Sequence, residues 1–140
     1  MLYSTYIYFL KALKRTLPEA RVETIPGVTA FGAAAALADF PIGASKAPVS
    51  IVPTSEDLST VENALATGGT VILMKIGKRL GPILDLLDRA GCIDRGVLVS
   101  RAGLAGQRVE TDLRALQGEA AEGAGNLSVI LIHADAGGER

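Results

Sequence analysis

The sequence predicts an α/β domain in which a mostly parallel or mixed β-sheet is covered by helices on both faces. Short runs rich in β-branched residues alternate along the chain with segments of helical periodicity. The continuously apolar run Thr70–Met74 is typical of a strand that is buried on both faces. The chain has 140 residues, 49% of them hydrophobic, which suffices for one domain, residues 1–140, with a substantial core.

The predicted helices are, in order, Thr5–Thr16, Val28–Ala38, Glu56–Ala66, Arg79–Ala90 and a short helix ending near Leu116. The first is amphipathic and is stopped by Pro18. Hydroxyl or carboxylate side chains cap the others: Thr29 the second, Thr54 or Ser55 the third, and Thr111 or Asp112 the last. The fourth helix ends at Gly91 and turns four apolar residues inward: Leu80, Ile83, Leu84 and Leu87.

The predicted strands are Arg21–Ile25, Val49–Val52, Thr70–Met74, Gly96–Ser100, Gln107–Glu110 and Leu127–Ile132. Thr67-Gly68-Gly69 is expected to be a turn, and Arg101 to Gly106 a glycine-rich loop before a short edge strand. Gly118–Gly125 reads as a polar connection and Ala134–Arg140 as a frayed tail. The sequence has no internal repeat and no glycine signature for cradling phosphates.

The composition excludes several classes of function. With 14 basic and 15 acidic residues the chain carries no electrostatic signature for nucleic acid. Its single cysteine, Cys92, is expected to be a small buried hydrophobe, and its single histidine, His133, to face solvent near the tail. Together they cannot form a zinc site, so no metal is expected. The apolar runs are too short to span a membrane, and we expect a cytoplasmic protein.

The segment Thr24–Ala36 is the most informative motif. A β-branched run is halted by Pro26 and Gly27 and passes at Thr29 into a helix of small residues. The exposed amides of a helix N-terminus beside a strand end suit a polar cofactor atom, and alanines allow close approach of a ligand. Taken alone, the motif favours an ordinary strand–turn–helix connection with an alanine packing face.

Five segments in order resemble the tetrapyrrole (corrin and porphyrin) methyltransferases, and within them the precorrin-2 C(20)-methyltransferase branch. The segments are Leu2-Tyr3-Ser4-Thr5, Pro26-Gly27-Val28-Thr29-Ala30-Phe31, Val71-Ile72-Leu73-Met74-Lys75, Arg101-Ala102-Gly103 and Leu127-Ser128-Val129-Ile130. The resemblance implies a mixed five-stranded sheet flanked by helices, similar to the C-terminal domain of these enzymes, with the N-terminal domain missing. It also implies C-methylation of precorrin-2 or its cobalt form at carbon 20, in cobalamin biosynthesis.

The resemblance further implies a cofactor, S-adenosyl-L-methionine, which becomes S-adenosyl-L-homocysteine, and a tetrapyrrole substrate; family enzymes are homodimers. The matching positions are Leu2 and Tyr3 beside the methionine end, Thr29 and Ala30 at the helix start, Met74 on the adenosine, Ala102 near the adenine, and Leu127, Ser128 and Val129, whose backbone holds the adenine edge. Tyr3 could equally be a packed aromatic residue. Because a sulfonium methyl is already electrophilic, catalysis needs mainly positioning in a dry cleft.

Other interpretations stay open at this stage. Lys75 could steer substrate carboxylates or be an ordinary surface lysine, and Arg108 and Glu110 are read as solvated charges on an edge strand. No residue is identified as a catalytic base. The chain could instead be a non-catalytic dimerising module that seeks a partner for exposed apolar surface. A methylase for another tetrapyrrole carbon, or for diphthine or ribosomal RNA, is a third reading, and the near-neutral charge disfavours RNA.

Overall fold

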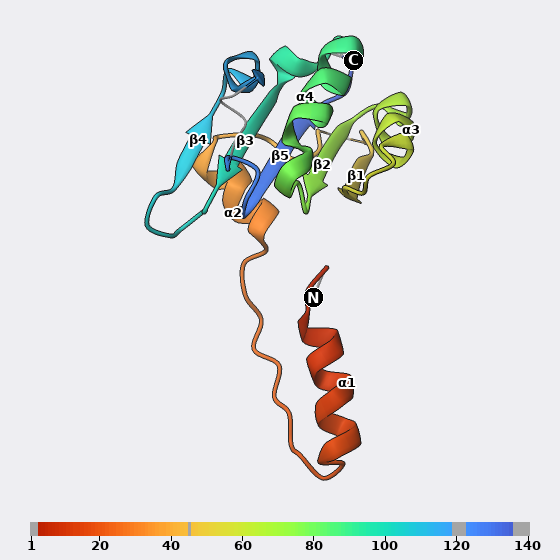
Figure 1. Ribbon diagram of the computed structural model, residues 1–140, viewed down its shortest axis with the longest axis vertical. Helices are drawn as coiled ribbons and strands as arrows, with labels where there is room; N and C mark the ends of the chain where they lie inside the picture. Colours follow the sequence, from red (N-terminus) through yellow and green to blue (C-terminus); the bar gives the residue numbers. More distant parts are fainter. Residues whose placement is uncertain (1–2, 45, 119–122, 136–140) are drawn as a thin grey trace.

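The β-sheet of the computed structural model has five strands in the order β1–β2–β5–β3–β4 (Figure 1). The structure describes residues 3–44, 46–118 and 123–135. Strand β1 runs parallel to β2, whereas every other neighbouring pair is antiparallel, so the sheet is mixed. The strands are β1 (Val49–Pro53), β2 (Thr70–Met74), β3 (Gly96–Ser100), β4 (Arg108–Glu110) and β5 (Ser128–His133). The predicted fold class is confirmed.

Helices cover both faces of this sheet. Helix α2 (Ala30–Leu37) packs on one face, where Ala34 lies in a cluster with Val129 and Leu131 of β5. Helices α3 (Ser59–Thr67) and α4 (Leu80–Arg89) cover the other, against Ile130 and Ile132. This alternation along β5 follows the two-residue period of a strand. The four apolar residues of α4 that were predicted to turn inward are all buried.

Within the described residues, three single-turn 3₁₀ segments connect these elements: η1 (Gly77–Arg79), η2 (Ile93–Arg95) and η3 (Leu113–Leu116). Asp112 caps η3, since its carboxylate accepts the N–H of Arg114 at 3.1 Å. Gly91 ends α4 with a φ of +66°, which glycine adopts without strain. Both features were predicted.

The start of α3 was predicted wrongly. The helix begins at Ser59, three residues later than expected, because the Asp57 carboxylate accepts both the N–H and the hydroxyl proton of Ser59. These hydrogen bonds hold the pKa of Asp57 below its usual value. Thr54 does not cap the helix: its hydroxyl donates to the carbonyl of Lys75 at 2.9 Å. Ser55 donates to the carbonyl of Asp57.

The segment Arg21–Ile25 was also predicted wrongly, because it is extended but belongs to no sheet. It follows helix α1 (Tyr6–Thr16), and the two project away from the sheet (Figure 1). A strand needs a neighbour for its backbone groups, and no described part of this chain offers one to Arg21–Ile25. The β-branched residues follow a strand pattern, but among the described residues none pairs with them as a neighbouring strand.

Smaller expectations have mixed outcomes. Gln107–Glu110 forms the expected edge strand except for its first residue, and β5 is shifted by one residue at each end.

Cys92 is buried as predicted, and burial raises the pKa of its thiol. The predicted connection Gly118–Gly125 and tail Ala134–Arg140 lie partly outside the described residues. In the described ranges no helix is long and apolar enough to cross a membrane, and no group of three or more metal-ligating side chains gathers.

His133 does not face solvent as predicted. Its half-buried ring stacks on Phe40, with centroids 4.2 Å apart and planes 13° from parallel. Burial first, and the positive charge of Arg95 second, lower the pKa of this imidazole below its ordinary 6.5. The sequence did not reveal this environment because the loop that carries Phe40 reaches His133 only in the folded chain.

We expect acidification to destabilise the fold through His133. Its pKa is lower in the folded than in the unfolded state, so between pH 7.5 and 5.5 the unfolded chain binds the extra proton and the free energy of unfolding falls. His133→Phe keeps an aromatic ring and removes the titrating group, so its unfolding free energy should vary less over this range. Urea titrations at both pH values measure the difference. Equal pH dependence in the two proteins would contradict the assignment, since His133 is the single histidine of the chain.

Candidate functional site

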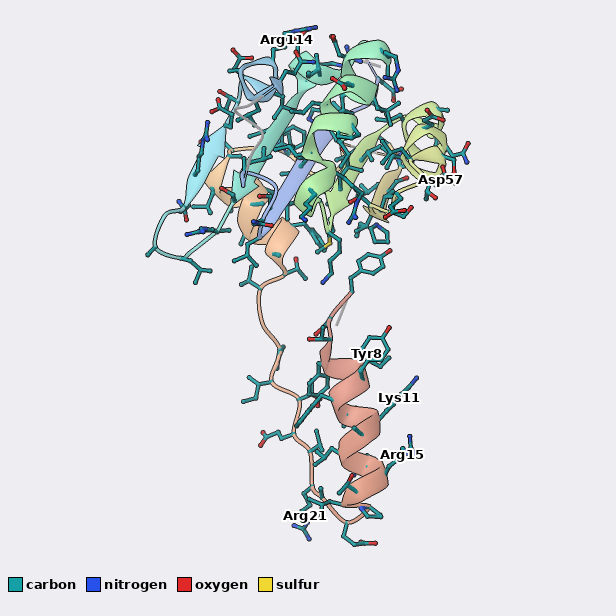
Figure 2. All side chains as sticks on the ribbon, viewed as in Figure 1. Tyr8, Lys11, Arg15, Arg21, Asp57 and Arg114 are labelled. Atoms are coloured by element: carbon teal, nitrogen blue, oxygen red, sulfur yellow. The ribbon has the colours of Figure 1, made fainter. Side chains whose placement is uncertain are left out.

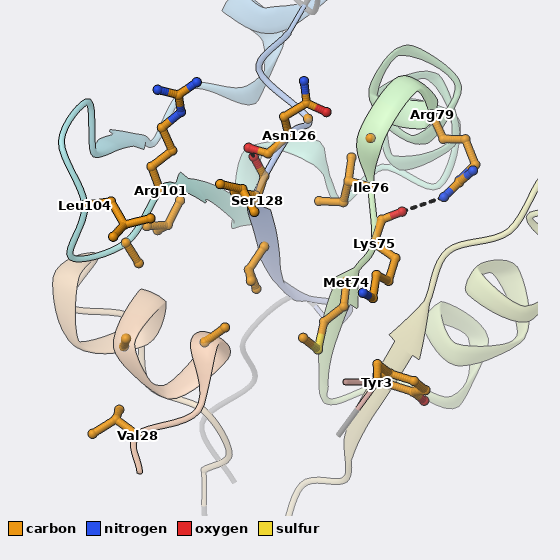
Figure 3. Close-up of a pocket in the computed structure, with 18 residues that line it drawn as sticks. Tyr3, Val28, Met74, Lys75, Ile76, Arg79, Arg101, Leu104, Asn126 and Ser128 are labelled. Atoms are coloured by element: carbon orange, nitrogen blue, oxygen red, sulfur yellow. Dashed lines mark hydrogen bonds between the residues drawn. The ribbon is translucent and has the colours of Figure 1, made fainter. Parts of the chain in front are cut away.

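A pocket of about 670 Å³ opens at one edge of the sheet (Figure 3). Strands β2 and β3 both run antiparallel to β5, so their carboxyl ends flank the amino end of β5. The lining therefore includes Met74 at the end of β2 with Lys75 after it, Arg101 and Ala102 after β3, and residues 125–129, which lead into β5 and form its first two positions. Helix α2 adds Ala30 and Ala33 from the face of the sheet that it covers. This volume is typical of small-molecule sites.

The backbone of Ser128 is the polar feature best placed to meet a ligand. The carbonyl of Leu127 accepts the N–H of Arg101 at 2.9 Å, so the peptide groups of Leu127 point toward β3 and those of Ser128 toward β2. The ladder between β2 and β5 ends at the pair Leu73–Ile130. In the described part of the chain the N–H and C=O of Ser128 therefore have no backbone partner. They form a donor–acceptor pair at the pocket.

The hydroxyl of Ser128 is already engaged. It donates to the carbonyl of Ala124 and lies 3.1 Å from the carbonyl of Asn126, within the turn before β5. Ser128 is buried. Its side chain thus holds the turn in place, and only its main chain is free to contact a ligand.

Several residues that line the pocket have strained backbone conformations. Five non-glycine residues of the described chain have positive φ, and four of them line this pocket: Tyr3, Lys75, Arg101 and Leu127. Such conformations cost about 1–3 kcal/mol each and are concentrated at functional sites. Lys75 is held at a φ of +61° through its carbonyl, which accepts hydrogen bonds from the Thr54 hydroxyl and the Arg79 guanidinium (Figure 3). Strand β2 ends at Met74, directly before this strained residue, and both residues line the pocket.

The charge of the lining is one-sided. Three cationic side chains line it, those of Lys75, Arg79 and Arg101, and among the described lining residues none is acidic. The chain as a whole has a net charge of −1. Three cations and no acidic side chain among the described lining residues favour a ligand that carries carboxylates or other anionic groups.

Two glycines that line the pocket, Gly77 and Gly125, are joined by a backbone hydrogen bond. The N–H of Gly77 donates to the carbonyl of Gly125 at 2.9 Å, which ties the segment after β2 to the turn before β5. A Cβ on Gly125 would lie within 2.0 Å of the Gly77 carbonyl oxygen. This approach requires glycine at position 125.

Most of the residues predicted from the sequence for cofactor binding meet in this pocket. Seven of them line it: Tyr3, Ala30, Met74, Ala102, Leu127, Ser128 and Val129. Thr29 does not line it but caps α2 next to Ala30, accepting the N–H of Gly32 at 3.2 Å. Leu2 lies outside the described residues. Tyr3 also donates weakly to the carbonyl of Ile51, at 3.4 Å.

Other lining residues were missed by the sequence analysis, notably Arg79, Arg101 and Asn126. Arg101 stands at the head of the predicted glycine-rich loop, which was a usable signal. Arg79 was read only as a helix start. Arg79 donates to the carbonyl of Lys75, four residues earlier, and also to the hydroxyl of Thr54, 25 residues earlier.

The chain belongs to the tetrapyrrole (corrin/porphyrin) methylase family, whose sequence profile matches residues 1–117. It is 32% identical over 108 residues to the cobalt-precorrin-2 C(20)-methyltransferase of Salmonella typhimurium, covering 77% of this chain and 44% of that protein. It is 27% identical over 132 residues to the precorrin-2 C(20)-methyltransferase of a Sinorhizobium species, covering 94% and 51%. The chain thus spans about half the length of these curated relatives.

Solved structures share the fold at low sequence identity. A cobalt precorrin-4 methyltransferase superposes with a TM-score of 0.72 at 20% identity, covering 96% of this chain and 61% of that one. The uroporphyrin-III C-methyltransferase of Thermus thermophilus, solved with S-adenosylhomocysteine, gives a TM-score of 0.60 at 20% identity, covering 95% and 61%. The predicted likeness to tetrapyrrole methylases is confirmed by these comparisons.

We expect Gly125→Ala to disturb the pocket. The new methyl group would force the Gly77 backbone away, and overpacking of this kind costs about 1–3 kcal/mol. Gly81→Ala is the matched control, because nothing lies within 4 Å of its Cβ position and alanine favours a helix. Urea denaturation should show a loss of stability for the first variant and none for the second. An unchanged midpoint for Gly125→Ala would contradict the close approach described here.

Proposed function

We propose that residues 1–140 form the S-adenosylmethionine-binding domain of a tetrapyrrole methyltransferase of cobalamin biosynthesis. The pocket at the ends of β2, β3 and β5 is the observation on which this proposal depends. The residues that line it range from Tyr3 to Val129, which are 126 positions apart in the sequence. They include residues from each of the five segments on which the family resemblance rests. Membership of the family supports methyl transfer as the chemistry.

The residues present fit the cofactor. Ala30, Ala102 and Met74 give an apolar wall with room for a flat nucleoside, and the free N–H and C=O of Ser128 suit the donor–acceptor edge of an adenine. When bound, S-adenosylmethionine supplies an electrophilic methyl group on a sulfonium. This domain's own part is to orient that group and to exclude water from one side of it.

The substrate we propose is precorrin-2 or its cobalt form, methylated at carbon 20. Two curated relatives with this activity match most of the chain, which supports this carbon over others. Corrin precursors carry several carboxylates, and Lys75, Arg79 and Arg101 would attract them. Lys75 has no ion pair with any described residue, which favours a steering role over a structural one. A homodimer and a cytoplasmic location stay predictions.

Calorimetric titration with S-adenosylhomocysteine tests the pocket. We expect saturable heat from the 140-residue chain, and at least tenfold weaker binding, about 1.4 kcal/mol, for Ala102→Leu, whose added methylenes would fill the wall beside the adenine. Ala66→Leu on the exposed side of α3 is the control and should bind as the parent does.

Two results would count against the proposal. One is the absence of heat at millimolar ligand from a folded chain, which would show that this domain alone lacks a competent site. The other is equal affinity of Ala102→Leu and the parent, which would place the ligand elsewhere.

A further inference from the structure

Lys75 stands opposite Ser128 in the register of the antiparallel ladder between β2 and β5. The ladder ends at the pair Leu73–Ile130, and each further step along β2 would move one residue back along β5. Two such steps would pair Lys75 with Ser128. Strand β2 instead ends at Met74, directly before this pair would form. The ladder therefore stops just short of the residue whose unpaired backbone faces the pocket.

A regular continuation of β2 would occupy the backbone of Ser128. Successive carbonyls of a strand point to opposite sides. The carbonyl of Met74 points toward β1, where it accepts the N–H of Thr54 at 2.8 Å. In a regular strand the carbonyl of Lys75 would therefore point toward β5 and accept the N–H of Ser128. The sheet and a ligand would then compete for the same donor and acceptor.

Two side chains hold the carbonyl of Lys75 on the opposite side. It accepts the Thr54 hydroxyl at 2.9 Å and Nη2 of Arg79 at 2.5 Å (Figure 3). Nε of Arg79 also donates to the Thr54 hydroxyl oxygen, at 3.3 Å, so the two side chains support each other. The carbonyls of Met74 and Lys75 thus both bind Thr54, which a regular strand does not allow. The φ of +61° at Lys75 produces this turn of the chain.

The core fixes both side chains in place. Thr54 directly follows β1, is 6% exposed and does not line the pocket. Arg79 directly precedes Leu80, the first residue of α4, which is 1% exposed. The packing of β1 and α4 therefore determines where the carbonyl of Lys75 is held.

We propose that Thr54 and Arg79 are positioning residues that keep the backbone of Ser128 open for the ligand. They bind the carbonyl that would otherwise join Ser128 in the ladder, and they hold Lys75 in a conformation that a residue with a side chain rarely adopts. Without them β2 extends by one hydrogen-bonded pair, and the donor–acceptor edge of the pocket is lost. The inference rests on the proposed function, in which that edge meets an adenine.

Calorimetry with S-adenosylhomocysteine and amide hydrogen exchange at Ser128 test this role in the 140-residue chain. Thr54→Val/Arg79→Met keeps side chains of similar length but removes the donors to Lys75. We expect about tenfold weaker binding and about tenfold slower exchange of the Ser128 N–H, because that N–H gains a backbone acceptor. Thr54→Ser retains the hydroxyl and should restore both values to those of the parent.

The matched control is Thr67→Val/Arg114→Met, which removes the same kinds of donor away from the pocket. The Thr67 hydroxyl donates to the carbonyl of Asn63 at 2.9 Å, at the end of α3. Arg114 binds Asp88 and Asp94 beside η2, which precedes β3 (Figure 2). Lost hydrogen bonds lower the urea midpoint in both double variants, whereas the affinity for S-adenosylhomocysteine should fall only in the first.

Two results would overturn the inference alone. One is parent-like affinity in the folded Thr54→Val/Arg79→Met variant. The other is unchanged exchange at Ser128, which would mean that Lys75 does not rejoin the ladder. Absence of binding by the parent would count against the proposed function instead, and exchange at Ser128 would still decide whether the two side chains keep that backbone open. If the double variant does not fold, Thr54→Val alone, compared with Thr54→Ser, gives the same two readouts.

Discussion

The insertion of β5 between β2 and β3 is the constraint on which the rest of the structure depends. Because β5 runs opposite to both neighbours, its first residues emerge where the other two strands end. Buried apolar side chains on both faces stabilise this arrangement, with Ile72 and Leu131 toward α2 and Leu73 and Ile130 toward α4. Each fully buried aliphatic side chain contributes about 1.5–3 kcal/mol. The pocket lies at the edge where this core stops.

The pocket shows how a regular sheet gives way to a binding surface. Strand β2 leaves its ladder at Lys75, and the hydrogen bonds from Thr54 and Arg79 hold the strained residue there. The departure leaves the peptide groups of Ser128 without a partner on that side. Buried or half-buried backbone groups are costly when unpaired, so a ligand that pairs with them gains correspondingly. Under the proposed function this geometry has a chemical meaning, since methyl transfer from a sulfonium requires positioning above all.

Helix α1 and the extended segment after it contrast with the packed sheet. The domain is well packed around its sheet, yet α1 and Arg21–Ile25 carry apolar and backbone groups that nothing described in the chain covers. The chain spans about half the length of its curated relatives, and a longer fold neighbour accommodates nearly all of it.

The sequence by itself determined the elements whose causes are local. Apolar periodicity predicted α4, the continuous apolar run predicted β2, and Thr29 and Asp112 capped their helices as their side chains allow. Seven of the nine expected site residues gather in one pocket, and their contact with a cofactor stays a prediction.

Only the tertiary structure decided what depends on distant partners. It directed the Thr54 hydroxyl to Lys75 instead of α3, stacked His133 on Phe40, left Arg21–Ile25 unpaired and placed Lys75 under strain. In each case the outcome depends on groups many positions away in the chain, or on groups that the described chain lacks. Local propensity carries no information about either.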